Sequence, residues 1–384
     1  MNNTKTMERS LLLFKESVKS KQSFETYLVR LKMFMKYHGF TSYDQIVIQP
    51  NLQELFEDWV IAQKQRVNPN GLATYYYGVK GFFDANEIEL NYKKIKKFFP
   101  QKIKKSGRKP YTTQQIKQLV DSQTNIRNKA IIHFVASSGI RIGALEGLKV
   151  KHLLDMPLGC KAVCVYEGSL EEHWTFITPE TSKFLEQYFK KRTSDGESLT
   201  PHSPVFRDTF RKYTVHRHAI PLKRKSFGNI ITNALRRSGV NLPKNNGRHE
   251  TMSWHGMRKR FVTILKNEVG IQNAVVERLV GHKVYQEDGI RIDLDDSYFR
   301  PTLDELFDKY KLAIHALTLD DMTRIQIKEI QIQKQYSVFE QEKQKHFEEK
   351  KKWYKTIIER ARTEGEIPDW LRPVMDEMIQ DFES

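Results

Sequence analysis

The sequence predicts a mainly α-helical fold that carries a small antiparallel β-sheet. Helical patterns, in which apolar residues recur every three or four positions, cover residues 9–90. They are found again before residue 160 and after residue 178. Within 160–178 the composition changes, because "CKAVCVYEG" and "EHWTFITPE" are rich in β-branched and aromatic residues. The segment "GSLEE" between them supplies a turn, so we expect one β-hairpin inside a helical protein.

Residues 1–92 are expected to form a small helical N-terminal domain. The stretch "SFETYLVRLKMFMKYHGF" has helical spacing, with Ser23 as a candidate N-cap and Gly39 as the stop. Two further helices are expected at "NLQELFEDWVIAQKQ" and "LATYYYGVKGFFDAN". A basic linker, residues 93–110, ends at "SGRKP", where glycine and proline interrupt the chain.

Residues 111–315 are expected to form the second domain. A helix begins near "YTTQQIKQLVDS", where Thr112 or Thr113 can cap it. The stretch "NKAIIHFVASSGIRIGALEGL" predicts a buried helix, a glycine break and a further helical turn. After the hairpin, helices are expected at "ETSKFLEQYFKKR", "KSFGNIITNALRRSG", "WHGMRKRFVTILKNE" and "IQNAVVERLVGH". Residues 316–384 are charged and rich in helix formers, which fits an exposed helix, a loose coiled coil or a solvated tail equally well.

The composition excludes some classes of protein. The 384 residues suit two or three domains, and no apolar run approaches the roughly 20 residues of a membrane span. The N-terminal residues lack the pattern of a signal peptide, so we expect a cytoplasmic, nucleoid-associated protein without a membrane partner. Cys160 and Cys164 are the two cysteines, and they are expected to be ordinary thiols with no metal site.

Basic residues indicate a nucleic-acid partner. The formal net charge is +17, and two separated basic stretches, 91–109 and 207–225, hold one acid between them, Asp208. Such clusters suit a protein that holds a DNA duplex from more than one side. The residues expected to bind DNA are Lys93, Lys94, Lys96, Lys97, Lys102, Lys104, Lys105, Arg108, Lys109, Arg217, Lys223, Arg224 and Lys225.

Three short motifs and one tyrosine could carry chemistry. They are Arg141 in "SSGIRIGALEGL", His255 and Arg258 in "SWHGMRKRF", His282 in "ERLVGH", and Tyr298 in "DDSYFRPTLDEL". Taken singly, each motif is more often structural: a surface arginine, a helix cap or a packing tyrosine. Their occurrence together, in this order and in a basic chain, favours a shared site.

These motifs resemble those of the tyrosine recombinases, the phage-integrase family. "GIRIGAL", "HGMR" and "LVGH" are similar to that family's arginine, His-x-x-Arg and Gly-His motifs, over about residues 110–315. "SYFRPT" looks like the nucleophile motif of integrases from archaeal mobile elements, as does the hairpin region. The resemblance implies a site-specific recombinase in which residues 1–92 are a DNA-binding domain and residues 111–315 the catalytic domain. It also implies that the protein binds double-stranded DNA attachment sites as a homo-oligomer, dimer to tetramer. It also implies a 3′-phosphotyrosyl intermediate and no cofactor, metal or ATP.

The chain departs from the family pattern in the hairpin turn. The family's catalytic lysine usually lies there, but this turn has Leu170 at the expected position. Lys161 and Lys183 are the nearest candidates, and Lys183 is retained as a candidate catalytic residue. Because a strand alternates sides, Lys161 shares a face with apolar strand residues, and a histidine is favoured as the general acid. A second departure is Ala144, where bacterial members often have an acid; Glu146 is nearby.

The residue types suit metal-free phosphodiester cleavage. Tyr298 would be the nucleophile, while Arg141 and Arg258 would donate forked hydrogen bonds to the phosphate oxygens. His255 and His282 would transfer protons or contact the phosphate, because imidazole titrates near neutral pH. Two other functions stay open: a DNA-binding protein that has lost the chemistry, and a type IB topoisomerase. A covalent adduct separates the first from the enzymes, and strand exchange separates a recombinase from a topoisomerase.

Overall fold

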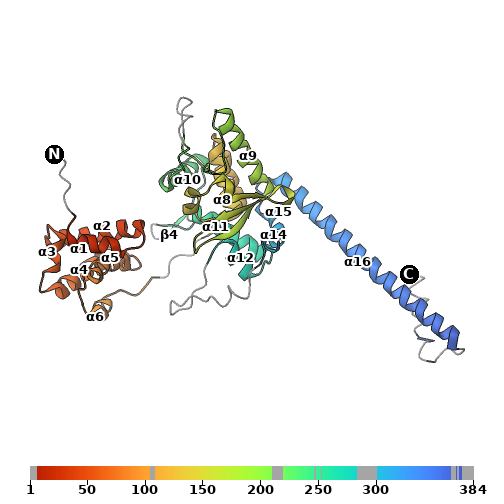
Figure 1. Ribbon diagram of the computed structural model, residues 1–384, viewed down its shortest axis with the longest axis horizontal. Helices are drawn as coiled ribbons and strands as arrows, with labels where there is room; N and C mark the ends of the chain where they lie inside the picture. The colour runs from red at the N-terminus through yellow and green to blue at the C-terminus, as the bar shows by residue number, and fades with distance from the viewer. Residues whose placement is uncertain are drawn as a thin grey trace. The chain divides into compact units, whose positions relative to one another are not determined.

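The fold is that of a computed structural model, which describes residues 7–103, 109–209, 219–245, 248–251, 253–282 and 301–364, together with 369 and 372–373. The chain divides into two compact units, Met1–Ser106 and Gly107–Ser384 (Figure 1). Helices dominate both, and one three-stranded antiparallel sheet lies in the second, which confirms the predicted fold class. No helix in the described ranges combines the length and the apolar character needed to cross a membrane.

The first unit is helical throughout its described residues and has an aromatic core. In chain order its helices are α1 Arg9–Ser17, α2 Lys21–His38, α3 Tyr43–Val47, α4 Leu52–Arg66, α5 Leu72–Ala85 and α6 Tyr92–Lys96. Phe34 of α2 meets the rings of Phe56 and Trp59 from α4 edge-on. It makes the same contact with Phe83 of α5. Such edge-to-face pairs stabilise the packing of α2, α4 and α5 beyond simple burial.

The two ends of α2 follow local rules of helix capping. The backbone N–H of Ser23 donates to the side-chain oxygen of Ser20, at 3.4 Å, and the helix begins at Lys21. The predicted N-cap, Ser23, is therefore wrong, because a serine three residues earlier is the better placed acceptor. Gly39 ends the helix as predicted, with a φ of 77° that glycine adopts at little cost.

The second unit combines helices with a short sheet. In chain order it contains α7 Thr113–Asp121, α8 Ile126–Ser138, η1 Ile142–Glu146, η2 Val150–His152, β1 Leu153–Asp155, η3 Pro157–Gly159, β2 Lys161–Val165, β3 His173–Ile177, α9 Pro179–Ser194, α10 Arg224–Ser238, β4 Lys244–Asn245, β5 Arg248–His249, α11 Ser253–Thr263, η5 Ile264–Glu268, α12 Asn273–Leu279, α14 Leu303–Lys311, α15 Ile314–Leu317 and α16 Asp321–Glu364. Thr112 caps α7 through a capping box with Gln115, which decides between the two predicted caps.

The sheet has the strand order β1-β2-β3, and each neighbouring pair is antiparallel. The predicted hairpin is confirmed as β2 and β3, in a register that pairs Val163 with Thr175. Strand β1 was not predicted, because it is three residues long and shows no alternation of apolar and polar residues. The hairpin turn, 166–172, is the part of the sheet that matters for the site described below.

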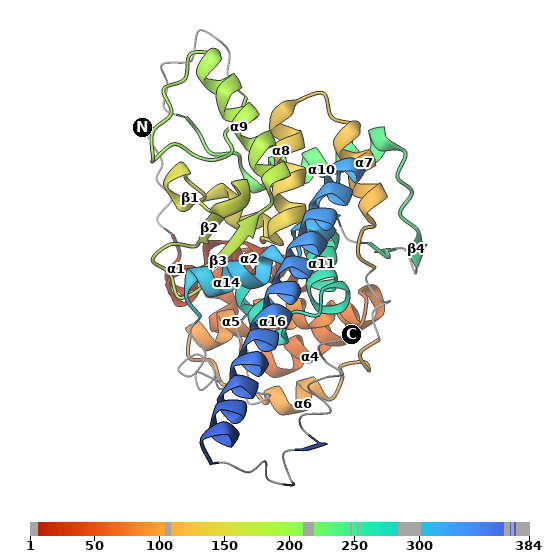
Figure 2. The same cartoon turned by 90° about the vertical axis from the view of Figure 1, so that its right-hand side faces the viewer.

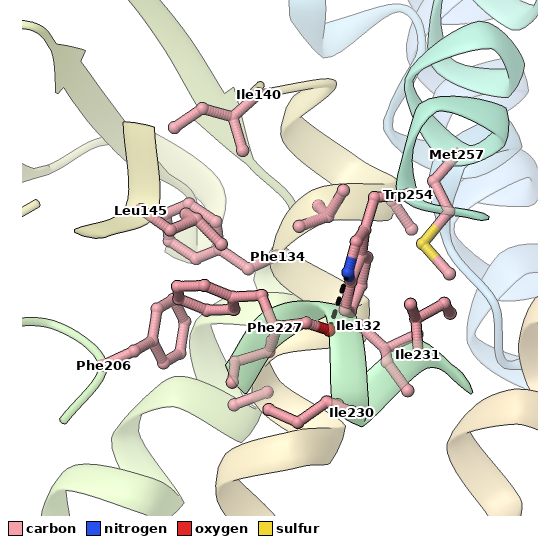
Figure 3. Packing of buried hydrophobic residues seen from close by; sticks show 14 of the residues in the cluster. Ile132, Phe134, Ile140, Leu145, Phe206, Phe227, Ile230, Ile231, Trp254 and Met257 are labelled. Atoms are coloured by element: carbon pink, nitrogen blue, oxygen red, sulfur yellow. Dashed lines mark hydrogen bonds between the residues drawn. The ribbon is translucent and has the colours of Figure 1, made fainter. Parts of the chain in front are cut away.

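Two apolar cores lie in this unit, and α8 contributes to the first of them with both of its faces. Every residue from Ala130 to Ser138 is buried, which confirms the predicted buried helix. Figure 3 shows the first core, where Trp254 of α11 donates its indole N–H to the carbonyl of Phe227 at 2.9 Å. In the second core, the hydroxyl of Tyr310 donates to the carbonyl of Ser137 at 3.0 Å. Tyr310 therefore has the packing role that the sequence predicted.

Helix α16 begins within the packed unit and then extends away from it in Figure 1; in the turned view of Figure 2 it points toward the viewer. The Glu180 carboxylate accepts the backbone N–H groups of Leu319 and Asp320, at 2.8 and 3.0 Å. Leu319 is buried in the first core, and Ile327 packs against the second. From 328 to 349 all described side chains are exposed. Packing thus continues nearly two helical turns beyond Asp321, past the predicted domain boundary at residue 315, because Glu180 anchors the start of α16.

Candidate active site

Arg141 lies directly after the left-handed turn that ends α8. Gly139 has a φ of 61°, and a Cβ there would overlap the Phe261 ring, so both conformation and packing require glycine. The turn directs Arg141 to the start of η1, where its Nη1 donates to the carbonyl of Gly281 at 2.9 Å. Among the described residues this is the one hydrogen bond of Arg141, so the other N–H groups of its half-buried guanidinium are left for a ligand.

Arg258 joins three segments that are distant in sequence. It lies on α11, is 3% exposed, and donates to the carbonyls of Gly139 at 2.6 Å and Val280 at 2.5 Å. The ends of α8 and α12 are thereby held to α11 by one side chain. Burial lowers the pKa of Arg258 to about 10, and the charge of Arg141 acts in the same direction. Two guanidinium groups close enough to repel each other make a site that an anion would stabilise.

His282 follows α12 and lies beside the arginine pair. Its Nδ1 donates to the Glu277 carboxylate at 2.5 Å, because a carboxylate can only accept. Burial lowers the pKa of His282, the hydrogen bond to Glu277 opposes that shift, and the charges of Arg258 and Arg141 add to it. With Nδ1 carrying the hydrogen, Nε2 is the ring nitrogen left for proton transfer.

His255 lies one turn before Arg258 on α11, as expected for residues three apart on one helix. Its side chain is exposed. Tyr298, the predicted nucleophile, lies outside the described residues. The same holds for Lys104, Lys105 and Arg108 of the linker, and for Arg217. Four predicted residues therefore lie in one region. Arg141 and Arg258 donate to the carbonyls of Gly281 and Val280, and His282 directly follows these two residues in the chain. His255 is on the same helix as Arg258.

Neither candidate lysine lies with this group. Lys161 pairs with Asp155 at 2.6 Å and with Glu186 at 3.2 Å, so its amine is engaged at the far end of the hairpin from the turn. Lys183 lines a cavity between α7, α9 and the start of α16, together with Lys117 and His133. None of the described residues that line that cavity belongs to the rest of the predicted catalytic set. Leu170, at the tip of the hairpin turn, is 80% exposed.

Two residues that flank the turn were not predicted from the sequence. The imidazole of His173, at the start of β3, packs against Gly281, and its Nδ1 donates to the carbonyl of Glu171 at 2.8 Å. Tyr166, just after β2, carries a φ of 58° and is influenced by the charges of Arg141 and Arg258. Both look like ordinary strand residues in sequence. The one feature of the sequence that could have indicated a functional role is their position, because they border the turn in which the family resemblance implies a lysine.

Gly281→Ala is expected to slow DNA cleavage at least about tenfold, because the new Cβ would overlap the His173 ring and displace the carbonyl that holds Arg141. Gly270→Ala is the matched control, since Gly270 has a similar φ of 76° but nothing within 4 Å of a new Cβ. Rates of covalent adduct formation and melting temperatures check this. Equal effects of the two substitutions would show that backbone strain, and not the contact with His173, is responsible.

The predicted DNA-binding residues fall into two described groups. In the first unit, Lys96, Lys97 and Lys102 are exposed, whereas Lys94 pairs with Glu57 at 2.8 Å. Lys93 is also exposed. In the second unit, Lys109 pairs with Glu250, Lys225 is exposed, and Glu146 holds both Lys223 and the backbone N–H of Arg224. Glu146, the acid near the departure at Ala144, thus caps α10.

Among the described residues no group of three or more His, Cys, Asp or Glu is arranged to hold a metal ion.

Comparisons with known proteins find a family match over the part of the chain that contains these residues. Residues 109–287, which contain Arg141, Arg258 and His282, match the phage integrase family. The chain is 23% identical over 267 residues to tyrosine recombinase XerC of Lactobacillus delbrueckii subsp. bulgaricus. The aligned region covers 66% of this chain and 80% of that relative.

Solved structures with some likeness include two recombinases with DNA. XerH bound to its difH substrate has a TM-score of 0.49 and 13% identity, covering 73% of this chain and 85% of that one. A lambda integrase dimer bound to a core site has a TM-score of 0.49 and 12% identity, covering 73% and 93%. The family match, the sequence relative and the joined arginine and histidine motifs lead to one conclusion: residues 109–287 form a phage integrase domain, and the chain has the activity of a site-specific recombinase.

Proposed function

We propose that this recombinase is the integrase of a mobile element of the archaeal type, and that it cleaves DNA by attack of Tyr298 on a phosphodiester. The observation that carries the proposal is the convergence of Arg141 and Arg258 on the backbone of 139 and 280–281. The archaeal assignment rests on "SYFRPT" and on the hairpin sequence. The product is a 3′-phosphotyrosyl bond, which conserves the energy of the broken bond, so rejoining needs neither ATP nor a metal.

Each residue of the site has a chemical role in this proposal. Arg141 binds the non-bridging phosphate oxygens through the N–H groups that Gly281 does not use. Arg258, whose two Nη atoms are engaged with carbonyls, supplies positive charge and holds the segments of the site together. Such preorganised charge stabilises the transition state because it needs no rearrangement as the phosphate gains charge.

The two histidines have separate roles in the proposed mechanism. The Nδ1–H of His282 is held by Glu277, and the lowered pKa of His282 keeps its ring neutral at pH 7. His255 is exposed on the same face of α11 as Arg258. We assign to His255 the removal of the phenolic proton of Tyr298, and to His282 a contact with the phosphate. Tyr298 itself is assigned from sequence alone.

The partner is double-stranded DNA, and the active form is an oligomer assembled on it. The net charge of +17 and the exposed lysines of the linker support binding to the DNA backbone. Exchange of two duplexes breaks four strands, and each chain contributes one Tyr298, which favours a tetramer formed from dimers. We infer that the protein acts in the cytoplasm, in association with the nucleoid.

Covalent capture tests the proposal. The protein is incubated with a pool of nicked duplexes that contain a randomised segment, and DNA that stays attached after denaturation is sequenced. We expect one recurring site, attached through a 3′-phosphate. A pool that yields bound but never attached DNA would favour the DNA-binding alternative. A captured site that is nicked and resealed, with no exchange between two duplexes, would favour the topoisomerase alternative.

Replacing Lys96, Lys97 and Lys102 with glutamine is expected to weaken binding to all DNA sequences alike. Each lost phosphate contact should make the plot of log affinity against log salt shallower by up to about 0.9. The exposed lysines Lys328, Lys343 and Lys355 of α16 serve as the matched control, since they carry the same charge outside the proposed interface. Titrations from low to high salt check this. An unchanged slope for the linker variant would show that these lysines do not contact the DNA backbone.

A further inference from the structure

Tyr166 is held in an unusual conformation at the mouth of the hairpin turn. It follows the last residue of β2, is half-buried, and has a φ of 58°. Bulky residues rarely adopt this left-handed region, and residues held in such conformations concentrate at active sites and ligand-binding sites. An asparagine or glycine would fit the turn with less strain, so the turn by itself does not explain the tyrosine.

The hydroxyl of Tyr166 lies beside η1, close to Gly143 and within the influence of the Arg141 and Arg258 charges. A Cβ placed on Gly143, two residues after Arg141, would lie 4.0 Å from it. Burial raises the pKa of Tyr166 and Glu171 raises it further, while the charges of Arg141, Arg258 and Arg224 oppose both. The phenol in turn raises the pKa of Arg258. Three guanidinium groups thus act on one phenol, for which the described residues supply no hydrogen-bond partner.

A proton donor at this site must hold its proton at neutral pH. The phenol of Tyr166 does so, because its pKa lies above the ordinary value of about 10. His173 and His282 do not, because burial lowers the pKa of each and both use Nδ1–H for an internal hydrogen bond. In the neutral histidines, the remaining nitrogen, Nε2, is an acceptor.

The two candidate lysines do not lie at this site. Residues 167–172 include no lysine, Lys161 is engaged in ion pairs with Asp155 and Glu186, and Lys183 lines a cavity elsewhere in the described part of the chain. A phenol and a lysine ammonium have similar pKa values in water, about 10 and 10.4, so one can take over the proton-donating task of the other. A phenol is also the better neighbour for two arginines, because it carries no positive charge when protonated.

We propose that Tyr166 donates the proton to the leaving 5′-oxygen, an inference that rests on the proposed function. As the bond from phosphorus to the Tyr298 oxygen forms, the bond from phosphorus to the 5′-oxygen breaks and that oxygen takes the Tyr166 proton. The Tyr298 proton passes to the imidazole of His255. Arg141 and Arg224 stabilise the Tyr166 phenolate. In the rejoining step the 5′-hydroxyl returns its proton to Tyr166, and His255 returns its proton to Tyr298.

The test compares two nicked duplexes that carry the captured site. One has an ordinary phosphodiester, and the other a 5′-bridging phosphorothiolate, whose sulfur leaves without protonation. Tyr166→Phe keeps the ring and the backbone conformation and removes one hydroxyl. We expect it to form adduct at least about 100-fold more slowly on the phosphodiester, and at nearly the parent rate on the phosphorothiolate.

Control variants separate this proposal from its alternatives. Tyr188→Phe, which removes another phenol from the same core, should cleave both substrates at the parent rate. Tyr298→Phe should form adduct with neither, and an adduct there would refute the proposed function and not the role of Tyr166. Equal impairment of Tyr166→Phe on both substrates, or no impairment, would overturn the inference. The inference would also be overturned if the phosphorothiolate rescued His173→Asn, His282→Asn or Lys183→Ala and did not rescue Tyr166→Phe.

Discussion

Substitution of Tyr298 by phenylalanine is expected to abolish the covalent protein–DNA adduct while leaving DNA affinity almost unchanged. The change removes the nucleophilic oxygen and keeps the ring, and binding depends chiefly on basic residues elsewhere. Adduct is measured by denaturing electrophoresis on the captured site, and affinity by titration at fixed salt.

Tyr285→Phe and Tyr310→Phe are the controls for this experiment. Tyr310 is fully buried and donates to the carbonyl of Ser137, so its loss should lower stability by about 1 kcal/mol without removing the adduct. Tyr285, like Tyr298, lies outside the described residues. An adduct that persists in Tyr298→Phe and disappears in either control would reassign the nucleophile.

Arg141→Ala and Arg258→Ala are expected to lower the cleavage rate on the order of 100-fold or more, and to differ in stability. Arg141 makes one internal hydrogen bond from a half-buried position, so its loss should act mainly on catalysis. Arg258 is 3% exposed and satisfies two carbonyls, so its loss should also cost about 1–3 kcal/mol for each carbonyl left without a donor.

Three measurements separate these effects: the rate of adduct formation, DNA affinity, and the midpoint of denaturant unfolding. Arg258→Lys provides the conservative variant, which keeps the charge and loses the fork that reaches Gly139 and Val280 together. Parallel losses of affinity and rate would make the arginines simple phosphate clamps. An Arg258→Ala protein that is as stable as the parent would contradict the role of Arg258 in holding α8, α11 and α12 together.

Short-range patterns were readable from the sequence because their causes are local. The buried helix α8, the glycine turn at Gly139, the hairpin and the capping of α7 all follow from spacing, β-propensity and turn chemistry. The errors were local as well. Ser23 was preferred to Ser20 as a cap, and β1 was overlooked because three residues cannot display a period.

The sequence by itself determined the fold class and presented Arg141, Arg258 and His282 as candidates, and its two basic stretches predicted a nucleic-acid partner. Only the tertiary structure decided how they meet, because their contacts run through backbone carbonyls of Gly139, Val280 and Gly281, which no side-chain pattern encodes. The tertiary structure also showed that Lys161 and Lys183 lie away from the site, because ion pairs and helix packing decide where the ammonium group of a lysine is held.

The same reason explains why Tyr166 and His173 were found only in the structure. Each belongs to a strand end whose composition signals β-structure and nothing more. Their chemistry arises from proximity to residues 25 or more positions away along the chain, such as Arg141 for Tyr166 and Gly281 for His173. Local sequence determines which elements form, whereas the environment of a titratable group depends on which elements pack around it, and that is decided by the whole fold.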